Sequence, residues 1–234
     1  FGKMSGMGMT IIMFPSIIIG AISTVLVPAI SEESSGRNLS AVNRQIRRSL
    51  TITAAVAAAA FGIFFALPDE LGILFYRRSD LGDLIFSLSF GVICSYTEAT
   101  LCGILNGLGK QRALLRNTLI MSAVDIIVLY ICLGSSEIGI YGYSIDFMMS
   151  PLAGCILNSM QIKKAVGVEP KFGRIIPRPL MSAFFEAASL RYIKNMLCST
   201  VQPQPLQTVA LIFLGIVIFC TAYFLSVRIA SADA

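Results

Sequence analysis

Four carboxylates, Glu98, Asp125, Asp146 and Glu186, lie inside long apolar stretches of this 234-residue chain. An ionised acid at the centre of a bilayer costs at least about 2.5 kcal/mol, so such residues normally face a polar cavity or a partner group. Counting along the helices places Asp125 near the bilayer midplane. The acids are therefore the first candidates for binding a proton, a sodium ion or the cationic part of a transported molecule.

Two interpretations of Glu98 and Asp125 remain open. In the first, both side chains line a cavity and bind a cation. In the second, they are protonated or hydrogen-bonded at packed helix contacts, where polar side chains stabilise helix association modestly. The partners expected in the second case are Tyr96, Thr97, Ser122 and Ser144.

The chain contains no histidine, which removes the commonest general base and metal ligand. Its six cysteines lie in or beside apolar segments and none form a C-x-x-C pair, so neither a zinc site nor a disulfide framework is indicated. No loop gathers an acid and a base with a nucleophile. We therefore expect no enzyme activity, no catalytic residue, no metal and no cofactor, and a membrane-bound transferase is the least favoured class.

Seven apolar segments must position the acids. A helix needs roughly 20 apolar residues to cross the hydrocarbon core, and most of the segments reach that length. The sixth is the weakest, because it carries Glu186, Arg191 and Lys194. Only 13% of the residues are charged, against about 25% in soluble domains. The sequence predicts an all-α, polytopic transmembrane helical bundle of about seven spans, over residues 9–30, 49–67, 84–105, 114–133, 140–160, 180–197 and 208–227.

The basic residues between these segments fall mostly on alternate sides. If the first segment runs from outside to inside, thirteen Lys and Arg residues lie on the inner side and five on the outer side. Short basic loops resist translocation, so this bias predicts the orientation. We expect a multi-pass protein of the cell (plasma) membrane with its N-terminus outside and its C-terminus in the cytoplasm. The net charge of +5 then reflects basic residues beside anionic headgroups, and no nucleic-acid partner is expected.

Local signals add detail to the spans. Pro15 and Pro28 predict kinks in the first segment, since proline removes a helical hydrogen bond. The stretch 41–48 has the spacing of an amphipathic lead-in to the second helix.

The connections between the spans also carry signals. Residues 71–76 suit a short interfacial helix in an outer loop, and the glycines of residues 103–112 predict a tight inner turn. Residues 161–179 form the most basic inner loop, in which Pro170, Pro177 and Pro179 prevent a continuous helix.

Several stretches resemble one family: Phe14–Ile19 (FPSIII), Ser23–Glu32 (STVLVPAISE), Leu74–Arg77 (LFYR) and Gly103–Gln111 (GILNGLGKQ). The family is the stage V sporulation protein B and polysaccharide-export branch of the multidrug/oligosaccharidyl-lipid/polysaccharide (MOP) superfamily. That superfamily also contains the lipid II flippases and the multidrug and toxin extruders. The resemblance is to the carboxyl half and weakens after about residue 165.

The resemblance implies two helical lobes around a central cavity, and movement of lipid-linked sugars or amphipathic drugs by alternating access. It makes this chain most of the second lobe, with residues 1–165 as five core spans and residues 166–234 as a basic inner loop and two further spans. A start at Phe1 without a methionine, a first segment that is already long enough to cross a bilayer, and an odd number of spans fit such a fragment. The implied partners are membrane lipids, a lipid-linked saccharide or amphipathic small molecule, and the missing amino-terminal lobe.

The resemblance also ranks the candidate residues of the half-cavity. Relatives often carry glutamine at the position of Glu98 and a basic residue at the position of Asp125, so this half-cavity is more acidic than usual. Lys3 is the one basic residue near the start of the cavity-facing first helix, and anion binding would rely on it or on the missing lobe. The expected substrate or ion-binding residues are Glu98, Asp125, Asp146 and Lys3. The leading expectation is a flippase or exporter of a peptidoglycan-related or sporulation-related saccharide lipid. The alternative is a proton- or sodium-coupled multidrug antiporter.

Overall fold

All regular elements that the structure describes are helices, as expected for an all-α bundle. The structure is a computed structural model, and it describes residues 3–36, 38–133, 141–167, 172–198 and 205–232. Apart from Phe14, Pro15 and Leu67, the seven predicted segments fall on helical residues within that part of the chain. The elements are η1 (Lys3–Gly8), α1 (Met9–Met13), α2 (Ser16–Ser35), α3 (Leu39–Ala66), α4 (Pro68–Tyr76), α5 (Gly82–Gly107), α6 (Gln111–Leu133), α7 (Gly142–Val166), α8 (Phe172–Ile175), α9 (Pro177–Cys198) and α10 (Pro205–Ala232).

Five of the described helices are long and apolar enough to cross a membrane: α2, α3, α5, α6 and α10. The protein is therefore a membrane protein. The helices α7 and α9 occupy the fifth and sixth predicted spans with 25 and 22 residues. They are long enough to cross a membrane, but they are not among the helices that are apolar enough to do so. Polar and charged residues account for the difference, and the sequence already marked the α9 segment as the weakest. Length and composition thus support five of the seven expected spans.

The first predicted span is not one continuous helix. Helix α1 ends at Met13 and helix α2 begins at Ser16, so the helix is interrupted at Pro15. Proline has no N–H to donate to the preceding turn, which explains the break. Pro28 lies inside α2, which continues to Ser35.

Helix α3 begins ten residues before the second predicted span. The side chain of Asn38 starts it, because its Oδ1 accepts a hydrogen bond from the backbone N–H of Ala41 at 3.2 Å, as an N-cap residue does. In the first turns Val42 and Ile46 are buried while the arginines are exposed. The predicted amphipathic lead-in is therefore confirmed and is continuous with the apolar helix.

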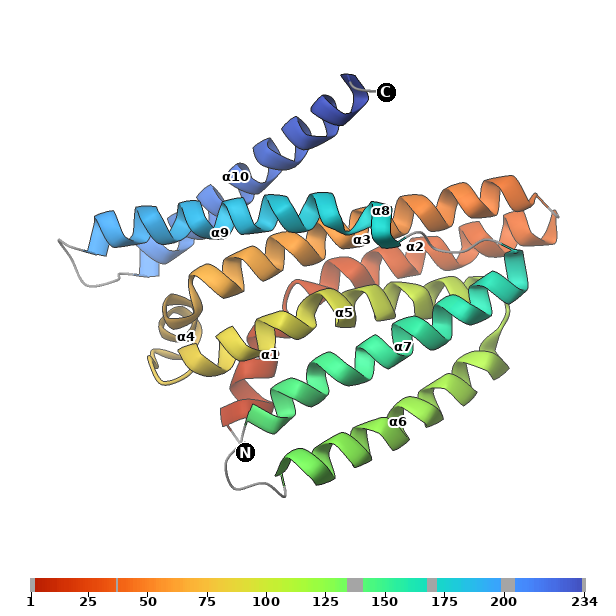
Figure 1. The fold of residues 1–234 in the computed structure, drawn as a ribbon, viewed down its shortest axis with the longest axis horizontal. Helices are drawn as coiled ribbons and strands as arrows, with labels where there is room; N and C mark the ends of the chain where they lie inside the picture. Colours follow the sequence, from red (N-terminus) through yellow and green to blue (C-terminus); the bar gives the residue numbers. More distant parts are fainter. Residues whose placement is uncertain (1–2, 37, 134–140, 168–171, 199–204, 233–234) are drawn as a thin grey trace. The chain divides into compact units, whose positions relative to one another are not determined.

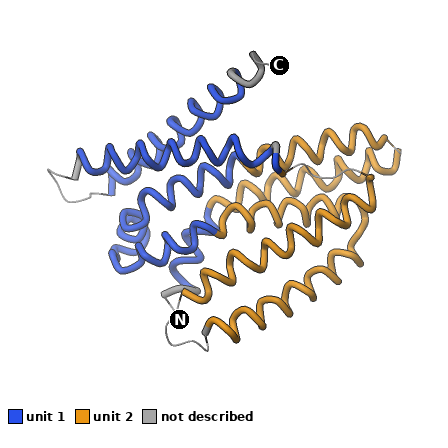
Figure 2. The backbone as a smooth tube through the Cα atoms, viewed as in Figure 1, with its two compact units in different colours: residues 1–14, 55–90, 173–234 blue, residues 15–54, 91–172 orange. Residues whose placement is uncertain are grey.

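The chain forms two compact units, each built from separated parts of the sequence (Figure 2). Unit 1 contains residues 1–14, 55–90 and 173–234, and unit 2 contains residues 15–54 and 91–172. Helices α3 and α5 each contribute to both units. The division expected near residue 165 followed the family resemblance and remains a prediction.

In unit 2, helix α5 packs closely against α2 through two glycines four residues apart. A Cβ on Gly103 would lie 3.0 Å from Oγ of Ser23, and one on Gly107 would lie 3.0 Å from the carbonyl oxygen of Val27. Small residues at this spacing let membrane helices approach closely. The other side of α5 is tied to α3 by a 2.7 Å hydrogen bond between the buried hydroxyls of Thr53 and Thr100. The predicted turn follows at once, with Gly109 at a φ of 67°.

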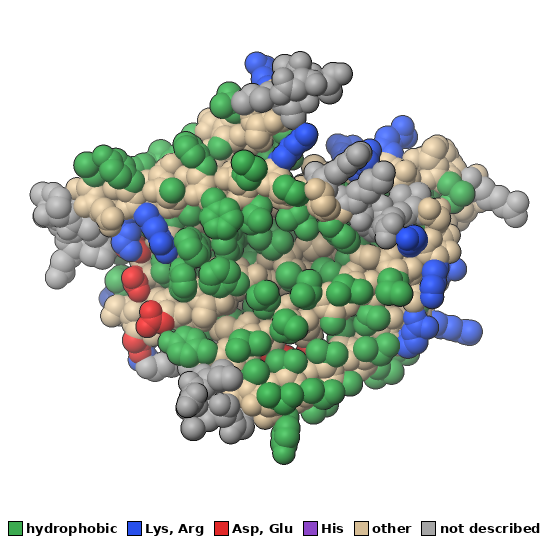
Figure 3. Space-filling view, in the orientation of Figure 1, with side chains coloured by type: hydrophobic (Ala, Val, Ile, Leu, Met, Phe, Trp, Pro, Cys, Tyr) green, Lys and Arg blue, Asp and Glu red, His purple; other side chains and the backbone are tan. Residues whose placement is uncertain are grey.

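The basic residues of unit 2 gather at one end of its helices, where the α5–α6 turn and the C-terminal end of α7 lie (Figures 1 and 3). Lys110, Arg112, Lys163 and Lys164 are all exposed there. Connections predicted to share one side of the membrane therefore do lie at one end of the unit. That this end faces the cytoplasm remains a prediction.

Candidate functional site

Glu98 is the centre of a hydrogen-bonded group in unit 2. Cys94, Glu98 and Cys102 are spaced four residues apart on α5 and so share one face of the helix. The thiol of Cys102 donates to Oε1 of Glu98 at 2.8 Å. The side-chain amide of Asn158, from α7, donates to the same oxygen at 3.2 Å. One carboxylate oxygen therefore accepts bonds from two helices.

The group extends to a third helix through a pair of asparagines. Nδ2 of Asn117, on α6, donates to Oδ1 of Asn158 at 2.9 Å. Both asparagines are completely buried. Arg116, at the exposed end, donates to Oδ1 of Asn117 at 3.4 Å. A continuous chain of polar side chains thus runs from an exposed guanidinium to the Glu98 carboxylate.

Gly154 makes room for this arrangement. A Cβ on Gly154 would lie 2.7 Å from Cγ of Glu98 and 2.7 Å from Sδ of Met121. A larger residue would separate α7 from α5 and α6 at the level of the carboxylate. The glycine is therefore the residue that lets the three helices meet around Glu98.

Asp125 and Asp146 form a second acidic group on the same pair of helices. Helices α6 and α7 lie side by side (Figure 1). Asp125 and Asp146 are close enough for their charges to repel. Asp146 is 8% exposed, and its Oδ1 has no hydrogen-bond partner. An unpartnered carboxylate oxygen beside a second carboxyl group favours a proton or a metal cation.

The two acidic groups are linked by the spacing of residues along α6 and α7. The residues of the two groups are spaced four positions apart along each helix. They are Asn117, Met121 and Asp125 on α6, and Asp146, Ser150, Gly154 and Asn158 on α7. At 1.5 Å per residue, Asn117 and Asp125 are about 12 Å apart along α6. We call this set of residues the polar seam; it consists of Glu98, Cys102, Asn117, Asp125, Asp146, Ser150 and Asn158.

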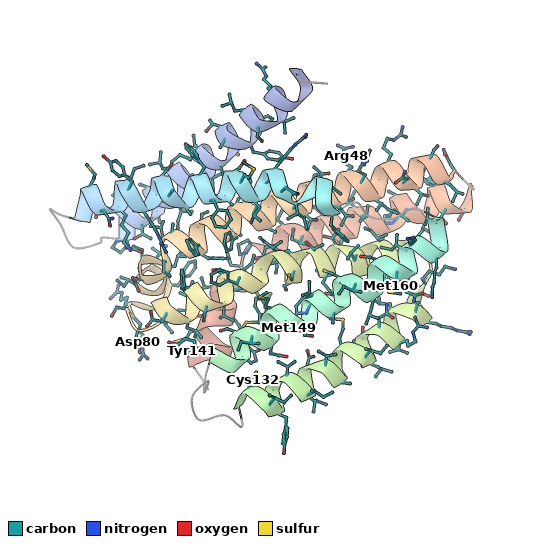
Figure 4. The ribbon with its side chains drawn as sticks, viewed as in Figure 1. Arg48, Asp80, Cys132, Tyr141, Met149 and Met160 are labelled. Atoms are coloured by element: carbon teal, nitrogen blue, oxygen red, sulfur yellow. The ribbon has the colours of Figure 1, made fainter. Side chains whose placement is uncertain are left out.

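The end of the seam at Asp146 is held by a close contact between α6 and α7. A Cβ on Gly142 would lie 2.7 Å from Cβ of Cys132. Cys132 near the end of α6 and Tyr141 at the start of α7 mark this end in Figure 4. Because Asp146 is one turn beyond Gly142, the contact fixes its distance from α6.

The acceptors of the polar seam are of the kind that hard cations take as ligands. These acceptors are carboxylate and amide oxygens, and the one thiol of the seam, that of Cys102, donates to the Glu98 carboxylate. Within the described residues, no group of three or more Cys, Asp or Glu side chains is arranged to hold a metal ion. A single proton, or a monovalent ion completed by water or by groups from elsewhere in the full-length protein, fits the seam better.

The structure thus brings together three of the four residues expected from the sequence. Glu98, Asp125 and Asp146 lie on facing helices of unit 2, and whether they bind substrate or ion remains a prediction. The backbone of Lys3 begins η1, and its side chain lies outside the described residues. The hydroxyl of Thr97, an expected partner of Glu98, donates instead to the backbone oxygen of Ile93 at 2.7 Å.

Sequence reasoning missed Asn117, Asn158 and Gly154. The signal that could have found them is the four-residue repeat of polar and small residues along α7. That repeat is visible in the sequence from residue 146 to residue 158, and in an apolar helix it predicts a polar stripe.

Replacing Asn158 with leucine is expected to lower the free energy of unfolding by about 1–3 kcal/mol. Leucine has the same number of side-chain heavy atoms and the same branching, but it leaves Asn117 and Glu98 without the bonds that cross the three helices. The measurement is denaturant-induced unfolding of the full-length protein in mild detergent. Asn106→Leu on the exposed side of α5 is the control, and an equal loss in both variants would contradict the role of Asn158.

Comparisons with known proteins give one informative similarity. No protein-family model matches the chain, and no solved structure matches it. The chain is 24% identical over 171 residues to "Stage V sporulation protein B" of Bacillus subtilis (strain 168). The match covers 73% of this chain and 33% of that protein, so the chain spans about a third of the length of the curated relative that it matches.

Proposed function

We propose that the full-length protein containing this chain is a membrane transporter that moves a lipid-linked oligosaccharide or polysaccharide precursor across the cell membrane by alternating access. In this proposal the chain supplies most of the carboxyl-terminal lobe. It contributes no hydrolytic chemistry, and the polar seam binds the coupling cation. The cargo itself is bound between this lobe and the amino-terminal lobe.

The observation that carries the proposal is the polar seam within an apolar helical bundle. Burying carboxylates and amides in a membrane protein is costly unless they are used or fully paired. Here Asn117, Asn158 and Glu98 are paired across three helices, while Oδ1 of Asp146 is not. A site with one free acceptor in a fixed frame can gain or lose a cation while the surrounding helices stay folded.

The similarity to a stage V sporulation protein B supports the class of transporter. It agrees with the resemblance to the polysaccharide-export branch, which is carried by the first predicted span and its exit, the outer loop 74–77 and the stretch 103–111. The proposal of a saccharide lipid as cargo rests on that similarity. The proposal of a cation site rests on the geometry of the polar seam.

The test is a translocation assay with the full-length protein in proteoliposomes. The probe is a polyprenyl diphosphate disaccharide that carries a fluorophore, and a membrane-impermeant quencher reports which leaflet holds it. The protein is expected to make the inner-leaflet probe accessible faster than liposomes that contain an unrelated helical membrane protein. An equal rate in both preparations would contradict the proposal.

An ion-coupled multidrug antiporter is the second candidate, and the acidity of the polar seam favours it. Asp125 and Asp146 could attract a lipophilic cation directly, without a saccharide lipid. The same proteoliposomes therefore receive a fluorescent lipophilic cation in a parallel arm. Efflux of that dye without movement of the saccharide probe would replace the first proposal with this one.

A further inference from the structure

We propose that Glu186, in unit 1, is a proton-binding site that controls the packing of α9 and α10 against the second half of α3. The proposal concerns a group outside the polar seam. It holds whether or not the protein moves a saccharide lipid, since it depends only on contacts within unit 1.

Glu186 is a fully buried carboxyl group without a partner. Its side chain is 0% exposed. Neither Oε1 nor Oε2 has a hydrogen-bond partner. An ionised carboxylate in such a place would keep its full desolvation cost, because nothing compensates its charge. The packing around the Glu186 side chain therefore fits the neutral, protonated acid.

Two glycines from neighbouring helices enclose the carboxyl group. A Cβ on Gly62, in α3, would overlap with Oε2 of Glu186. A Cβ on Gly215, in α10, would lie 3.1 Å from Oε1. Both positions lack a side chain where the acid sits, so α3, α9 and α10 meet around it.

Among the described residues around Glu186, no group could replace the proton. No ionisable residue occurs in 55–66 of α3 or in 205–219 of α10. On α9 itself, Lys194 pairs with Glu70 at 2.6 Å and Arg191 donates to the backbone oxygen of Phe65 at 2.9 Å. Arg178 lies two turns before Glu186 and is exposed.

The same surroundings disfavour a metal ion. The atoms nearest to a Cβ on Gly215, besides Oε1, are the methyl carbon Cδ1 of Leu190 and Cγ1 of Ile63. Hard cations require several oxygen ligands, and carbon atoms supply none. The proton is the one cation that needs no further ligand.

Loss of the proton from Glu186 must loosen the packing of α9 and α10 against α3. The apolar cluster beside it joins the three helices through residues that are almost completely buried. A charge on Glu186 would be stable only after water reached it, which requires α9 and α10 to move away from α3. Proton binding and helix packing are therefore coupled. The cluster comprises Ala66, Leu67, Ala187, Leu190 and Leu211.

The first test compares the pH dependence of unfolding in the full-length wild type and in Glu186→Gln. The folded protein holds the proton, whereas the unfolded chain releases it above a pH of about 4.3. Wild-type stability should therefore fall as pH rises, with the unfolding equilibrium constant increasing up to about tenfold per pH unit relative to the glutamine variant. Glu186→Asp should retain the slope.

The matched control is Asp83→Asn, which removes an exposed carboxyl group of the same unit. Its pH dependence should equal that of the wild type. Parallel curves for the wild type and Glu186→Gln would overturn the proposal, because they would show that Glu186 binds equal numbers of protons in both states.

A second measurement uses only the wild type, so it stands even if the variants fold poorly. Dicyclohexylcarbodiimide is apolar, and it adds to protonated carboxyl groups to give a stable N-acylurea without any other reactant. Mass spectrometry after treatment at pH 7 should find the adduct on Glu186 and not on Glu70, which is also buried but is paired with a lysine. An adduct on Glu70 with none on Glu186 would overturn the proposal.

Discussion

Replacing Lys194 with methionine is expected to lower the free energy of unfolding of the full-length protein by about 3–5 kcal/mol. Nζ of Lys194 lies 2.6 Å from Oε1 of Glu70, and the glutamate side chain is 5% exposed. The second oxygen of Glu70 has no hydrogen-bond partner. Removing the lysine would therefore leave a buried carboxylate with nothing to balance its charge. Denaturant-induced unfolding in mild detergent measures the loss.

An exposed ion pair of the same unit supplies the control. Arg78 and Asp80 form an ion pair at 2.9 Å, but their side chains are 41% and 43% exposed. Exposed pairs contribute about 0–1 kcal/mol, so Arg78→Met should change stability by no more than that. Adding Glu70→Gln to Lys194→Met should recover most of the loss. Equal effects of Lys194→Met and Arg78→Met would contradict a buried pair between α4 and α9.

The same contacts explain the unusual composition of α9. Arg191 lies over the ring of Phe65, with its Cζ 4.4 Å from the centroid, and it also donates to the Phe65 backbone oxygen. Lys194 is paired with Glu70. The charges that made this segment the weakest predicted span are thus used inside unit 1, where arginine and aromatic rings attract each other.

Replacing Asp146 with asparagine is expected to weaken cation binding at the polar seam about 100-fold, on the order of 3 kcal/mol, since opposite charges about 4 Å apart attract with an energy of that size near a protein surface. The reason is that the unpartnered Oδ1 of Asp146 supplies a charged acceptor beside Asp125. Asparagine keeps the shape and one oxygen but loses the charge. Asp125→Asn should act in the same direction.

The measurement is equilibrium binding of radioactive sodium to the purified full-length protein at fixed pH, repeated as a pH titration at fixed sodium. The exposed Asp83→Asn variant is the control and should bind as the wild type does. Unchanged affinity in Asp146→Asn, for both sodium and protons, would remove the Asp125–Asp146 pair from the proposed coupling site.

Local signals in the sequence predicted most of the helices. The length of the apolar segments, the short helix now seen as α4, and the glycine turn before α6 depend on neighbouring residues, so they could be read directly. The break at Pro15 was expected only as a kink. Proline alone does not determine whether a helix bends or stops, as Pro28 inside α2 shows.

The candidate site was predicted only in part. Its acids can be recognised from the residues around them in the sequence, whereas their hydrogen-bond partners cannot. Glu98, Asp125 and Asp146 stand out because charged residues are rare in apolar helices. Their neighbours come from other helices: Asn158 is 60 positions from Glu98 and 41 from Asn117. Such pairings depend on how helices pack, and composition contains no information about them.

The most direct test of the central claim measures how the translocation rate of the fluorescent saccharide lipid responds to an imposed sodium or proton gradient. Proteoliposomes would contain the full-length wild type, Asp125→Asn or the exposed control Asp83→Asn. We predict that the gradient changes the rate for the wild type and the control but not for Asp125→Asn. The same gradient dependence in Asp125→Asn as in the wild type would contradict a coupling role for the polar seam.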